Sequence, residues 1–288
     1  MAVIQYFDPW KGKFCTCPPK YTLNPYTGCH HGCLYCYITS FIPQASVVRE
    51  KPSLLKTVKR EIQKLEPRYL SLSNSSDPYP RKEEEKKYTR TVLEICKDYD
   101  FPVLLITKSP LVVRDSDILQ TMPAVVSITI TTIDPEKAKI LEPDAPSPEE
   151  RLWALRKLAQ ANIPTVLRLD PIIPGLNDDP GEWEKILRIL QSFTRQVVAS
   201  TFKPRADSWK RITAAFPHLF STRSHYTQRV GNSFYLEREK RKEILQTLKD
   251  LVHAYGMFFS SCREGFPEWN DLHCDGSAWF NLSRAPLR

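Results

Sequence analysis

Hydrophobic residues along the chain follow two alternating spacings, one typical of helices and one typical of strands. Between residues 54 and 65, leucine, valine and isoleucine recur every three or four positions, which predicts a helix. Residues 69–74 alternate apolar and polar side chains, which predicts a strand. Because the same alternation continues downstream, we expect a chain built from repeated helix and strand units.

The alternation extends to residue 202 and then changes character. Predicted helices cover residues 84–99, 148–161 and 182–193, and predicted strands cover residues 103–107, 125–131, 165–169 and 197–202. Strands separated by helices pair in parallel, and catalytic residues then gather at the carboxyl ends of the strands. Residues 203–236 break the rhythm, before a long predicted helix over 237–255 and an apolar run over 257–261. The predicted fold class is therefore α/β.

Composition favours a single enzyme with an anionic partner. The 288 residues suffice for one barrel-like domain or at most two small domains. The formal charge of +8 with a pI near 9.0 favours an anionic, phosphate-bearing partner; an ordinary solvated surface is the alternative. No run of about 18 apolar residues is present, and the start of the chain lacks the basic and apolar regions of a signal peptide. Eight cysteines in such a chain suit a reducing compartment, so we predict a cytoplasmic protein.

Three cysteines stand close together on one short segment. Cys29, Cys33 and Cys36 have the spacing Cys-x3-Cys-x2-Cys, and the aromatic Tyr35 precedes the last of them. Three thiolates can hold three irons of a 4Fe-4S cluster and leave the fourth iron open for chemistry. Zinc is the alternative, but zinc sites usually use two separated Cys-x2–4-Cys knuckles, and no second knuckle follows here.

This spacing resembles the radical S-adenosylmethionine (SAM) superfamily. The resemblance implies a 4Fe-4S cluster whose open iron chelates SAM, and an electron donor such as ferredoxin or flavodoxin that drives cleavage of SAM to a 5'-deoxyadenosyl radical. It also implies a partial (β/α)6 barrel. We therefore predict an N-terminal extension over residues 1–20, the barrel over 21–203, and a C-terminal cover over 204–288.

Further motifs narrow the resemblance to the spore photoproduct lyase-like branch of this superfamily. They are Asn24-Pro-Tyr-x-Gly-Cys, Ser76-Asp-Pro-Tyr-Pro80, Thr107-Lys-Ser109, Glu142-Pro-x-Ala-Pro-Ser-Pro148 and Pro171-x-Ile-Pro-Gly-Leu-Asn177. The resemblance implies that Ser76, Asp77 and Lys108 hold SAM. Their chemistry fits, because a lysine ammonium pairs with the SAM carboxylate while the other two bond its polar groups. An ordinary turn is the alternative for residues 76–80.

Two predicted strands carry other candidate cofactor contacts. Ser127, Thr129 and Thr131 alternate on one strand face, so they could bond the cofactor or satisfy one another. Arg168 near the end of the next strand could meet a SAM carboxylate or a substrate phosphate. A buried ion pair with Asp170, two residues further along, is the alternative.

The substrate is inferred from charge and from one departure. Asn74 occupies the position where the lyase carries a hydrogen-donating cysteine, and an amide cannot do this, so the lyase's own repair route is not expected. A basic and aromatic set in residues 203–229 resembles a nucleic-acid surface; a plain basic surface with core aromatics is the alternative. Its members are Lys203, Arg205, Trp209, Lys210, Arg211, Arg223, His225, Tyr226 and Arg229. We predict hydrogen abstraction from a nucleic acid base; the alternatives are a protein or small anionic substrate, or a non-catalytic metal-bound nucleic-acid-binding module.

Four of the remaining cysteines lie in loops near the two ends of the chain. Cys15 and Cys17 precede the first barrel strand, and Cys262 and Cys274 follow the last apolar run. They could converge on a second iron-sulfur cluster or a zinc ion. Inert thiols, or a disulfide joining the two ends, are the alternatives. Cys96, in contrast, falls on the apolar face of a predicted helix and is expected in the core.

Overall fold

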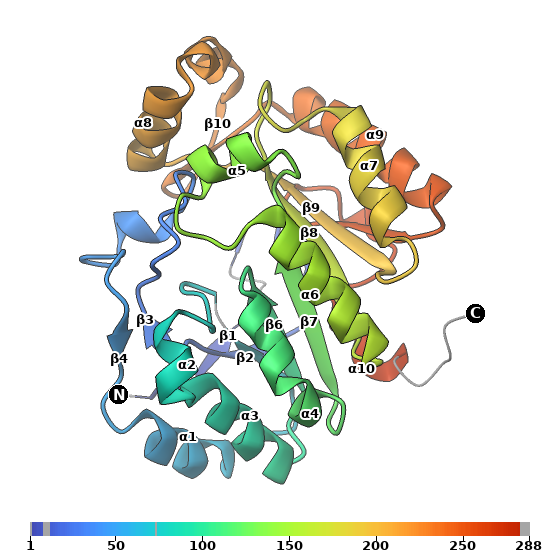
Figure 1. Cartoon of the computed structure of the whole chain (residues 1–288). Helices are drawn as coiled ribbons and strands as arrows, with labels where there is room; N and C mark the ends of the chain where they lie inside the picture. The colour runs from blue at the N-terminus through green and yellow to red at the C-terminus, as the bar shows by residue number, and fades with distance from the viewer. Residues whose placement is uncertain (1, 8–11, 73, 283–288) are drawn as a thin grey trace.

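One eight-stranded sheet forms the centre of the structure (Figure 1). The computed structural model describes residues 2–7, 12–72 and 74–282. In the sheet the strand order is β1-β2-β5-β6-β7-β8-β9-β12; every neighbouring pair runs parallel except β1 with β2. The strands of this sheet are β1 (Gln5–Phe7), β2 (Lys20–Leu23), β5 (Leu70–Leu72), β6 (Val103–Thr107), β7 (Ala124–Thr129), β8 (Thr165–Ile172), β9 (Gln196–Thr201) and β12 (Phe258–Ser261).

The remaining elements are helices and two small hairpins. The hairpin strands are β3 (Tyr26–Thr27), β4 (Arg49–Glu50), β10 (Gln228–Val230) and β11 (Ser233–Tyr235). The α-helices are α1 (Leu54–Ile62), α2 (Lys82–Lys86), α3 (Tyr88–Asp98), α4 (Ser116–Leu119), α5 (Pro135–Leu141), α6 (Pro148–Gln160), α7 (Pro180–Leu190), α8 (Ala206–Ala215), α9 (Arg238–Ala254) and α10 (Trp279–Leu282). Short 3-10 helices are η2 (Ile38–Ser40), η3 (Pro110–Asp115), η4 (Pro217–His225) and η5 (Pro267–Trp269).

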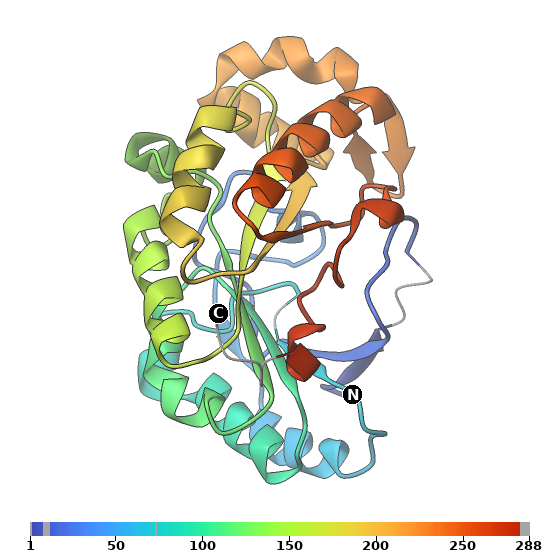
Figure 2. The same cartoon turned by 90° about the vertical axis from the view of Figure 1, so that its right-hand side faces the viewer.

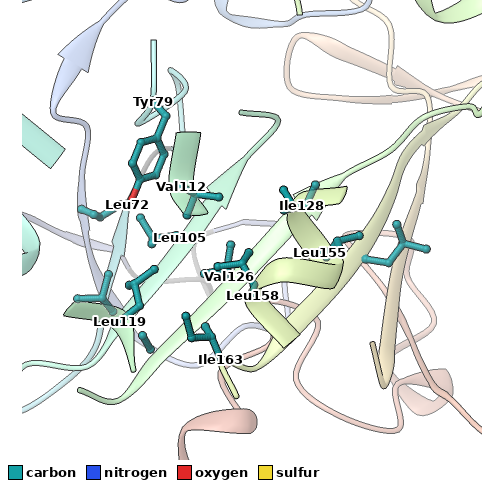
Figure 3. Packing of buried hydrophobic residues seen from close by; sticks show 14 of the residues in the cluster. Leu72, Tyr79, Leu105, Val112, Leu119, Val126, Ile128, Leu155, Leu158 and Ile163 are labelled. Atoms are coloured by element: carbon teal, nitrogen blue, oxygen red, sulfur yellow. The ribbon is translucent and has the colours of Figure 1, made fainter. Parts of the chain in front are cut away.

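Helices cover the outer face of the sheet and build the main hydrophobic core there (Figures 1 and 3). Strand residues such as Leu105 and Val126 pack against helix residues such as Leu155 and Leu158, and all four are fully buried. Helix α6 begins with a capping box, in which Ser147 and Glu150 satisfy each other's backbone N–H groups. Local capping thus fixes the start of a helix whose apolar side packs on the sheet.

The inner face of the sheet changes from apolar to polar along the strands. Near the amino-terminal ends, Leu104, Val125 and Val166 form a small cluster closed by Trp279 of α10. Gly276 makes this close approach possible, since its φ is +91° and a Cβ there would lie 2.9 Å from Val166 Cγ2. This apolar cluster fills the amino-terminal half of the inner face, and the polar side chains of the face lie towards the carboxyl-terminal ends of the strands.

The observed elements agree with the predicted fold class and refine its boundaries. Strand β6 matches the prediction, whereas the single helix predicted over 84–99 is divided into α2 and α3. Lys87 separates them with φ of 53°, and Glu83 accepts hydrogen bonds from the N–H groups of Thr89 and Arg90 that begin the second helix. Within the region predicted as the cover, α9 and β12 add one more parallel strand beside β9.

No helix in residues 2–7, 12–72 and 74–282 is both long enough and apolar enough to cross a membrane.

Candidate active site

The three clustered cysteines lie on a loop between β3 and η2, beside the ends of the parallel strands. The Cys29 N–H donates to the Ala45 carbonyl at 2.8 Å, and the Cys36 N–H donates to the Cys33 carbonyl at 3.1 Å. Gly28 must be glycine, because its φ is +82° and a Cβ would lie 2.2 Å from the Val47 carbonyl oxygen. Backbone bonds and close packing therefore fold this loop tightly enough to hold three thiols near one another.

The surroundings of these thiols suit a bound cation. Burial raises the pKa of the Cys29 thiol to about 11, and burial also raises the pKa of Cys33 and Cys36. A thiolate in such a place needs positive charge from a metal, and three thiols with one iron left open is the donor set of a SAM-binding 4Fe-4S cluster. As they stand, no three His, Cys, Asp or Glu side chains in the described residues already enclose a metal site.

A buried carboxylate, Glu142, joins the cysteine loop to the barrel. Tyr35 donates its hydroxyl to Glu142 Oε1, and Thr131 donates to the same oxygen at 3.0 Å. Arg151 forms an ion pair with Glu142 at 2.5 Å, and the Lys108 ammonium lies 4.0 Å away. Residues from the loop, the end of β6, the segment after β7 and α6 therefore meet at one carboxylate.

Electrostatics keep this carboxylate ionised. Burial alone would raise the pKa of Glu142, but Arg151 and Lys108 lower it below its usual range. Burial alone would lower the pKa of Lys108, but Cys33 and Glu142 raise it. The Lys108 ammonium also lies 5.5 Å from the centre of the Tyr35 ring. A positive charge is thus held next to the cysteine loop.

Asp77 is placed to position Lys108. Its Oδ1 accepts hydrogen bonds from the Tyr79 N–H at 2.9 Å and the Thr107 hydroxyl at 2.7 Å, while its Oδ2 accepts from the Lys108 N–H at 2.8 Å. Its neighbour Ser76 donates to the Tyr26 carbonyl at 3.1 Å. These bonds form the turn that was the alternative for residues 76–80, and they also fix the backbone at the end of β6.

Other predicted cofactor contacts lie on the inner face of the sheet. Ser127 is fully buried on β7, and its hydroxyl has no hydrogen-bond partner within the described protein. Thr129, two residues further along the strand, is also buried. Arg168 on β8 forms an ion pair with Asp170 at 2.7 Å, the alternative that its sequence position left open. Ser127 therefore has a free donor, whereas Arg168 already has a partner.

The C-terminal region docks on the cysteine loop through α8. Arg211 donates from Nε to the Leu34 carbonyl at 3.0 Å and from Nη2 to the Cys36 carbonyl at 2.8 Å. Trp209 and Tyr226, expected on a stacking surface, are instead buried and pack together against Phe202. Their burial corrects the expectation of an exposed stacking surface and agrees with the alternative of core aromatics, since their apolar rings supply the small core that supports α8 and η4.

Aromatic rings are displayed instead directly after the cysteine loop. Tyr37 and Phe41 are 44% and 52% exposed, and their ring centres lie 5.9 Å apart at an interplanar angle of 29°. The Arg205 guanidinium lies 5.7 Å from the first ring centre and 5.5 Å from the second. The three form an exposed, positively charged aromatic surface, which we call the stacking surface.

The four loop cysteines from the two ends of the chain lie close to one another, apart from the cysteine triplet. The Cys17 sulfur lies 3.8 Å from that of Cys15 and 3.5 Å from that of Cys274, and the Cys262 thiol interacts with Cys274. Arg168 lies beside Cys262. All eight cysteines are free thiols in this structure, and Cys96 is buried in the main core as expected.

A cavity of about 530 Å³ opens on another side of the cysteine loop. His30 and His31 line it together with residues that include Tyr79, Ser109 and Trp153. None of the predicted SAM contacts belongs to its lining, so the cavity is distinct from the predicted cofactor site. Burial lowers the pKa of His31 to about 4, which keeps this imidazole neutral near pH 7.

Sequence reasoning missed two residues that organise the site. Glu142 lay inside a recognised motif, but nothing in its local spacing indicated a buried carboxylate at the cysteine loop. Arg151 had no signal beyond its place in a predicted helix, and it donates to the carbonyls of Pro146 at 2.8 Å and Thr129 at 3.1 Å. Only the packing of α6 against β7 brings it to Glu142.

Comparison with known proteins assigns this site to a class. The family model described as the Radical SAM superfamily matches residues 23–190, more than half of the chain. The chain therefore belongs to the radical SAM superfamily, and membership implies a 4Fe-4S cluster and SAM as cofactors.

Curated relatives share part of their length with the chain. An uncharacterized protein of Methanocaldococcus jannaschii is 34% identical over 172 residues, which cover 55% of this chain and 62% of that protein. An uncharacterized protein of Mycobacterium bovis is 25% identical over 188 residues, covering 59% of this chain and 54% of that protein. The matched part thus spans little more than half the length of these relatives.

Solved structures show which fold the chain adopts. A spore photoproduct lyase variant superposes with a TM-score of 0.68 at 18% identity, covering 83% of this chain and 76% of the lyase. The lyase complexed with dinucleoside spore photoproduct gives a TM-score of 0.65 at 17% identity, with coverage of 83% and 76%. SuiB of Streptococcus suis bound to S-adenosylmethionine gives 0.58 at 10% identity, with coverage of 88% and 53%. The fold is therefore similar to that of spore photoproduct lyase.

Replacing the buried carboxylate should destabilise the fold strongly. Glu142→Gln would leave the Arg151 guanidinium buried without its counter-charge, so we expect the free energy of unfolding to fall by about 3–5 kcal/mol. The exposed Glu149→Gln on α6 is the matched control and should change it by about 0.5 kcal/mol or less. Guanidinium unfolding followed by circular dichroism measures the free energy of unfolding of both variants. Equal losses of stability in the two variants would contradict the role of Glu142 as the counter-charge of Arg151.

Proposed function

We propose that the protein is a radical SAM enzyme that abstracts a hydrogen atom from a nucleic acid base. The observation that carries the proposal is the position of the stacking surface, directly beside the cysteine loop on which the family's cluster would sit. A cluster bound by these cysteines would supply one electron for the reductive cleavage of SAM to methionine and a 5'-deoxyadenosyl radical, the species that would take the hydrogen atom. The electron comes from a donor of the ferredoxin or flavodoxin class.

In this proposal, Cys29, Cys33 and Cys36 hold the cluster, and Lys108 binds the SAM carboxylate. Lys108 suits this role because its ammonium lies close to the loop while Glu142 remains 4.0 Å away, leaving it able to pair with an incoming carboxylate. Asp77 acts by fixing the Lys108 backbone. The proposed SAM contacts also include Tyr35, Ser76, Ser127, Thr129 and Arg168.

Nucleic acid is favoured over other substrates by two independent features. Paired exposed rings flanked by a guanidinium can stack on bases of any sequence, and the net charge of +8 attracts phosphate. The spore photoproduct lyase structures supply a precedent, since one is complexed with a dinucleoside photoproduct. A base in RNA or DNA is the proposed target; repair of spore photoproduct itself is not, because Asn74 replaces the hydrogen-donating cysteine expected there.

We also propose that Cys15, Cys17, Cys262 and Cys274 hold a second metal centre. The support is the convergence of thiols from positions 257 residues apart in sequence onto one place. A cytoplasmic location remains a prediction from the sequence.

Removing the cysteine triplet tests the enzyme assignment. The Cys29→Ala, Cys33→Ala and Cys36→Ala triple variant should lose the broad visible absorption of the cluster and form no 5'-deoxyadenosine from SAM and dithionite after anaerobic reconstitution. Cys96→Ala, which removes a buried thiol elsewhere, should retain both signals. Product analysis by chromatography decides the outcome, and deoxyadenosine from the triple variant at the parent rate would refute the assignment.

The proposed contact between Lys108 and SAM is tested by measuring SAM affinity. Lys108→Ala should weaken SAM binding by about 1.5–3 kcal/mol, the typical value of a hydrogen bond to a charged group, while iron content stays unchanged. The exposed Lys139→Ala serves as the control and should bind SAM like the parent. Anaerobic titration calorimetry on reconstituted protein measures this, and equal affinities in all three proteins would show that Lys108 does not contact SAM.

The stacking surface is tested with single-stranded oligonucleotides. Tyr37→Ala and Phe41→Ala should each weaken binding by about 1–3 kcal/mol, the usual loss per stacked base. Phe258→Ala removes an exposed ring at the amino-terminal end of β12 and should leave affinity unchanged. Fluorescence anisotropy at fixed salt measures all three. Unchanged affinity in the first two variants would indicate a protein or small anionic substrate instead.

A further inference from the structure

Four thiols from the two ends of the chain occupy one place on the inner side of the sheet. Cys15 and Cys17 precede β2, whereas Cys262 directly follows β12 and Cys274 precedes α10. In Figure 2 the red C-terminal segment passes beside the blue N-terminal segment, and the sulfur contacts join the two. The Cys262 N–H donates to the Ala199 carbonyl at 2.8 Å, which fixes this residue as a continuation of β12.

The distances between sulfurs discriminate between the two kinds of metal centre. A tetrahedral zinc ion with Zn–S bonds of about 2.3 Å holds its sulfurs about 3.8 Å apart. The Cys15–Cys17 and Cys17–Cys274 sulfur distances are 3.8 Å and 3.5 Å. In a 4Fe-4S cluster each thiolate binds a different iron, so the sulfurs stand farther apart than the ligands of a single ion. The observed spacing therefore favours one ion.

The segments carrying the thiols are anchored independently of any metal. Lys20 and Asp275 form a fully buried ion pair at 2.7 Å, and the Tyr69 hydroxyl donates to the same carboxylate at 2.5 Å. Asn270 donates to the Thr16 hydroxyl at 3.3 Å. Each cysteine pair thus lies within a few residues of a bond that joins the two ends.

The charges around the thiols also suit a tetrathiolate ion. Four thiolates with one Zn²⁺ carry a net charge of −2. Lys20 lies close to Cys17 and Cys274, Arg168 close to Cys262, and Arg263 close to both Cys15 and Cys262. Lys20 and Arg168 are already paired with Asp275 and Asp170, so these cations together with Arg263 offset only part of that negative charge.

We propose that Cys15, Cys17, Cys262 and Cys274 bind one structural zinc ion that clasps the two ends of the chain across the inner face of the sheet. This inference specifies the second metal centre proposed above and does not depend on the substrate. Binding releases one proton from each of four thiols per Zn²⁺ and involves no change in oxidation state. With four protein ligands the site is closed, so the ion takes no part in SAM chemistry.

The spacing within each cysteine pair differs from that of common zinc motifs, so the sequence alone left the kind of metal open. Cys15-Thr-Cys17 is shorter than the usual Cys-x2–4-Cys knuckle, and its partners lie twelve positions apart near the other terminus. The four side chains are not yet arranged to hold a metal, which is equally true of the cluster triplet. Cys15 and Cys262 are partly exposed, so their side chains have room to change rotamer on metal binding.

Elemental analysis of fully loaded, anaerobically purified protein tests the clasp. We expect about one zinc and about four irons per chain. The double variant Cys17→Ser, Cys274→Ser should lose the zinc and keep the irons and the visible absorption of the cluster. Cys96→Ser, which alters a buried thiol outside the clasp, should keep both metals. With Co²⁺ in place of zinc, the parent and Cys96→Ser should show the absorption of tetrahedral thiolate-bound cobalt, and the double variant should not.

A single change guards against a variant that does not fold. Cys15→Ser alters a partly exposed ligand, and it should reduce zinc retention after dialysis against a chelator while the cluster absorption remains. Chelation should also lower the melting temperature of the parent but not of the double variant.

Each other metal content would contradict the zinc site in a different way. About eight irons without zinc would keep a second metal centre and exclude zinc. Four irons without zinc, or a Cys17–Cys274 disulfide in anaerobic protein, would exclude both. None of these results alters the deoxyadenosine test, so the enzyme assignment stands or fails separately.

Discussion

The buried charge of Glu142 is the constraint on which the arrangement of the site depends. Removing a carboxylate from water costs several kcal/mol unless opposite charge and hydrogen bonds replace the solvent. Arg151 supplies the charge, and Tyr35 and Thr131 supply hydrogen bonds. Because these partners come from α6, the cysteine loop and the segment after β7, the carboxylate is satisfied only when all three are in place. Formation of the loop is thereby coupled to completion of the barrel.

The same geometry leaves the Lys108 ammonium able to bind an incoming anion. Arg151 is almost fully buried and held by carbonyls as well as by Glu142, whereas the Lys108 side chain remains 16% exposed and lies at the limit of ion-pair distance. Asp77 fixes the Lys108 backbone without using its ammonium. A site with one locked cation and one accessible cation can stabilise its own fold and still receive an anionic ligand.

Several side chains of the C-terminal region stabilise the cysteine loop and the fold and do not form an exposed binding surface. Trp209 and Tyr226 fill a small core, and Arg211 holds the carbonyls of the cysteine loop. Lys203 is likewise engaged, in an ion pair with the buried Glu264 at 2.5 Å. Because α8 is fixed in this way, Arg205 just before it is held against the exposed rings that follow the loop. Basic residues that look equivalent in sequence therefore divide into structural and surface groups.

The sequence alone determined features that depend on neighbours along the chain. Hydrophobic periodicity identified the α/β fold class and the limits of β6. The spacing of Cys29, Cys33 and Cys36 predicted a cluster loop and indicated the superfamily, because three ligands on eight consecutive residues need no long-range information. The capping box that begins α6 is local in the same sense.

Features made by distant segments were decided only by the tertiary structure. Nothing in local spacing pairs Glu142 with Arg151, or places the sulfurs of Cys17 and Cys274 3.5 Å apart. Periodicity also could not tell that Trp209 is buried while Tyr37 is exposed, since both are aromatic residues in polar surroundings. Which face a residue presents, and what charge it meets there, depends on how whole helices and strands pack, and that packing is set by the chain as a whole.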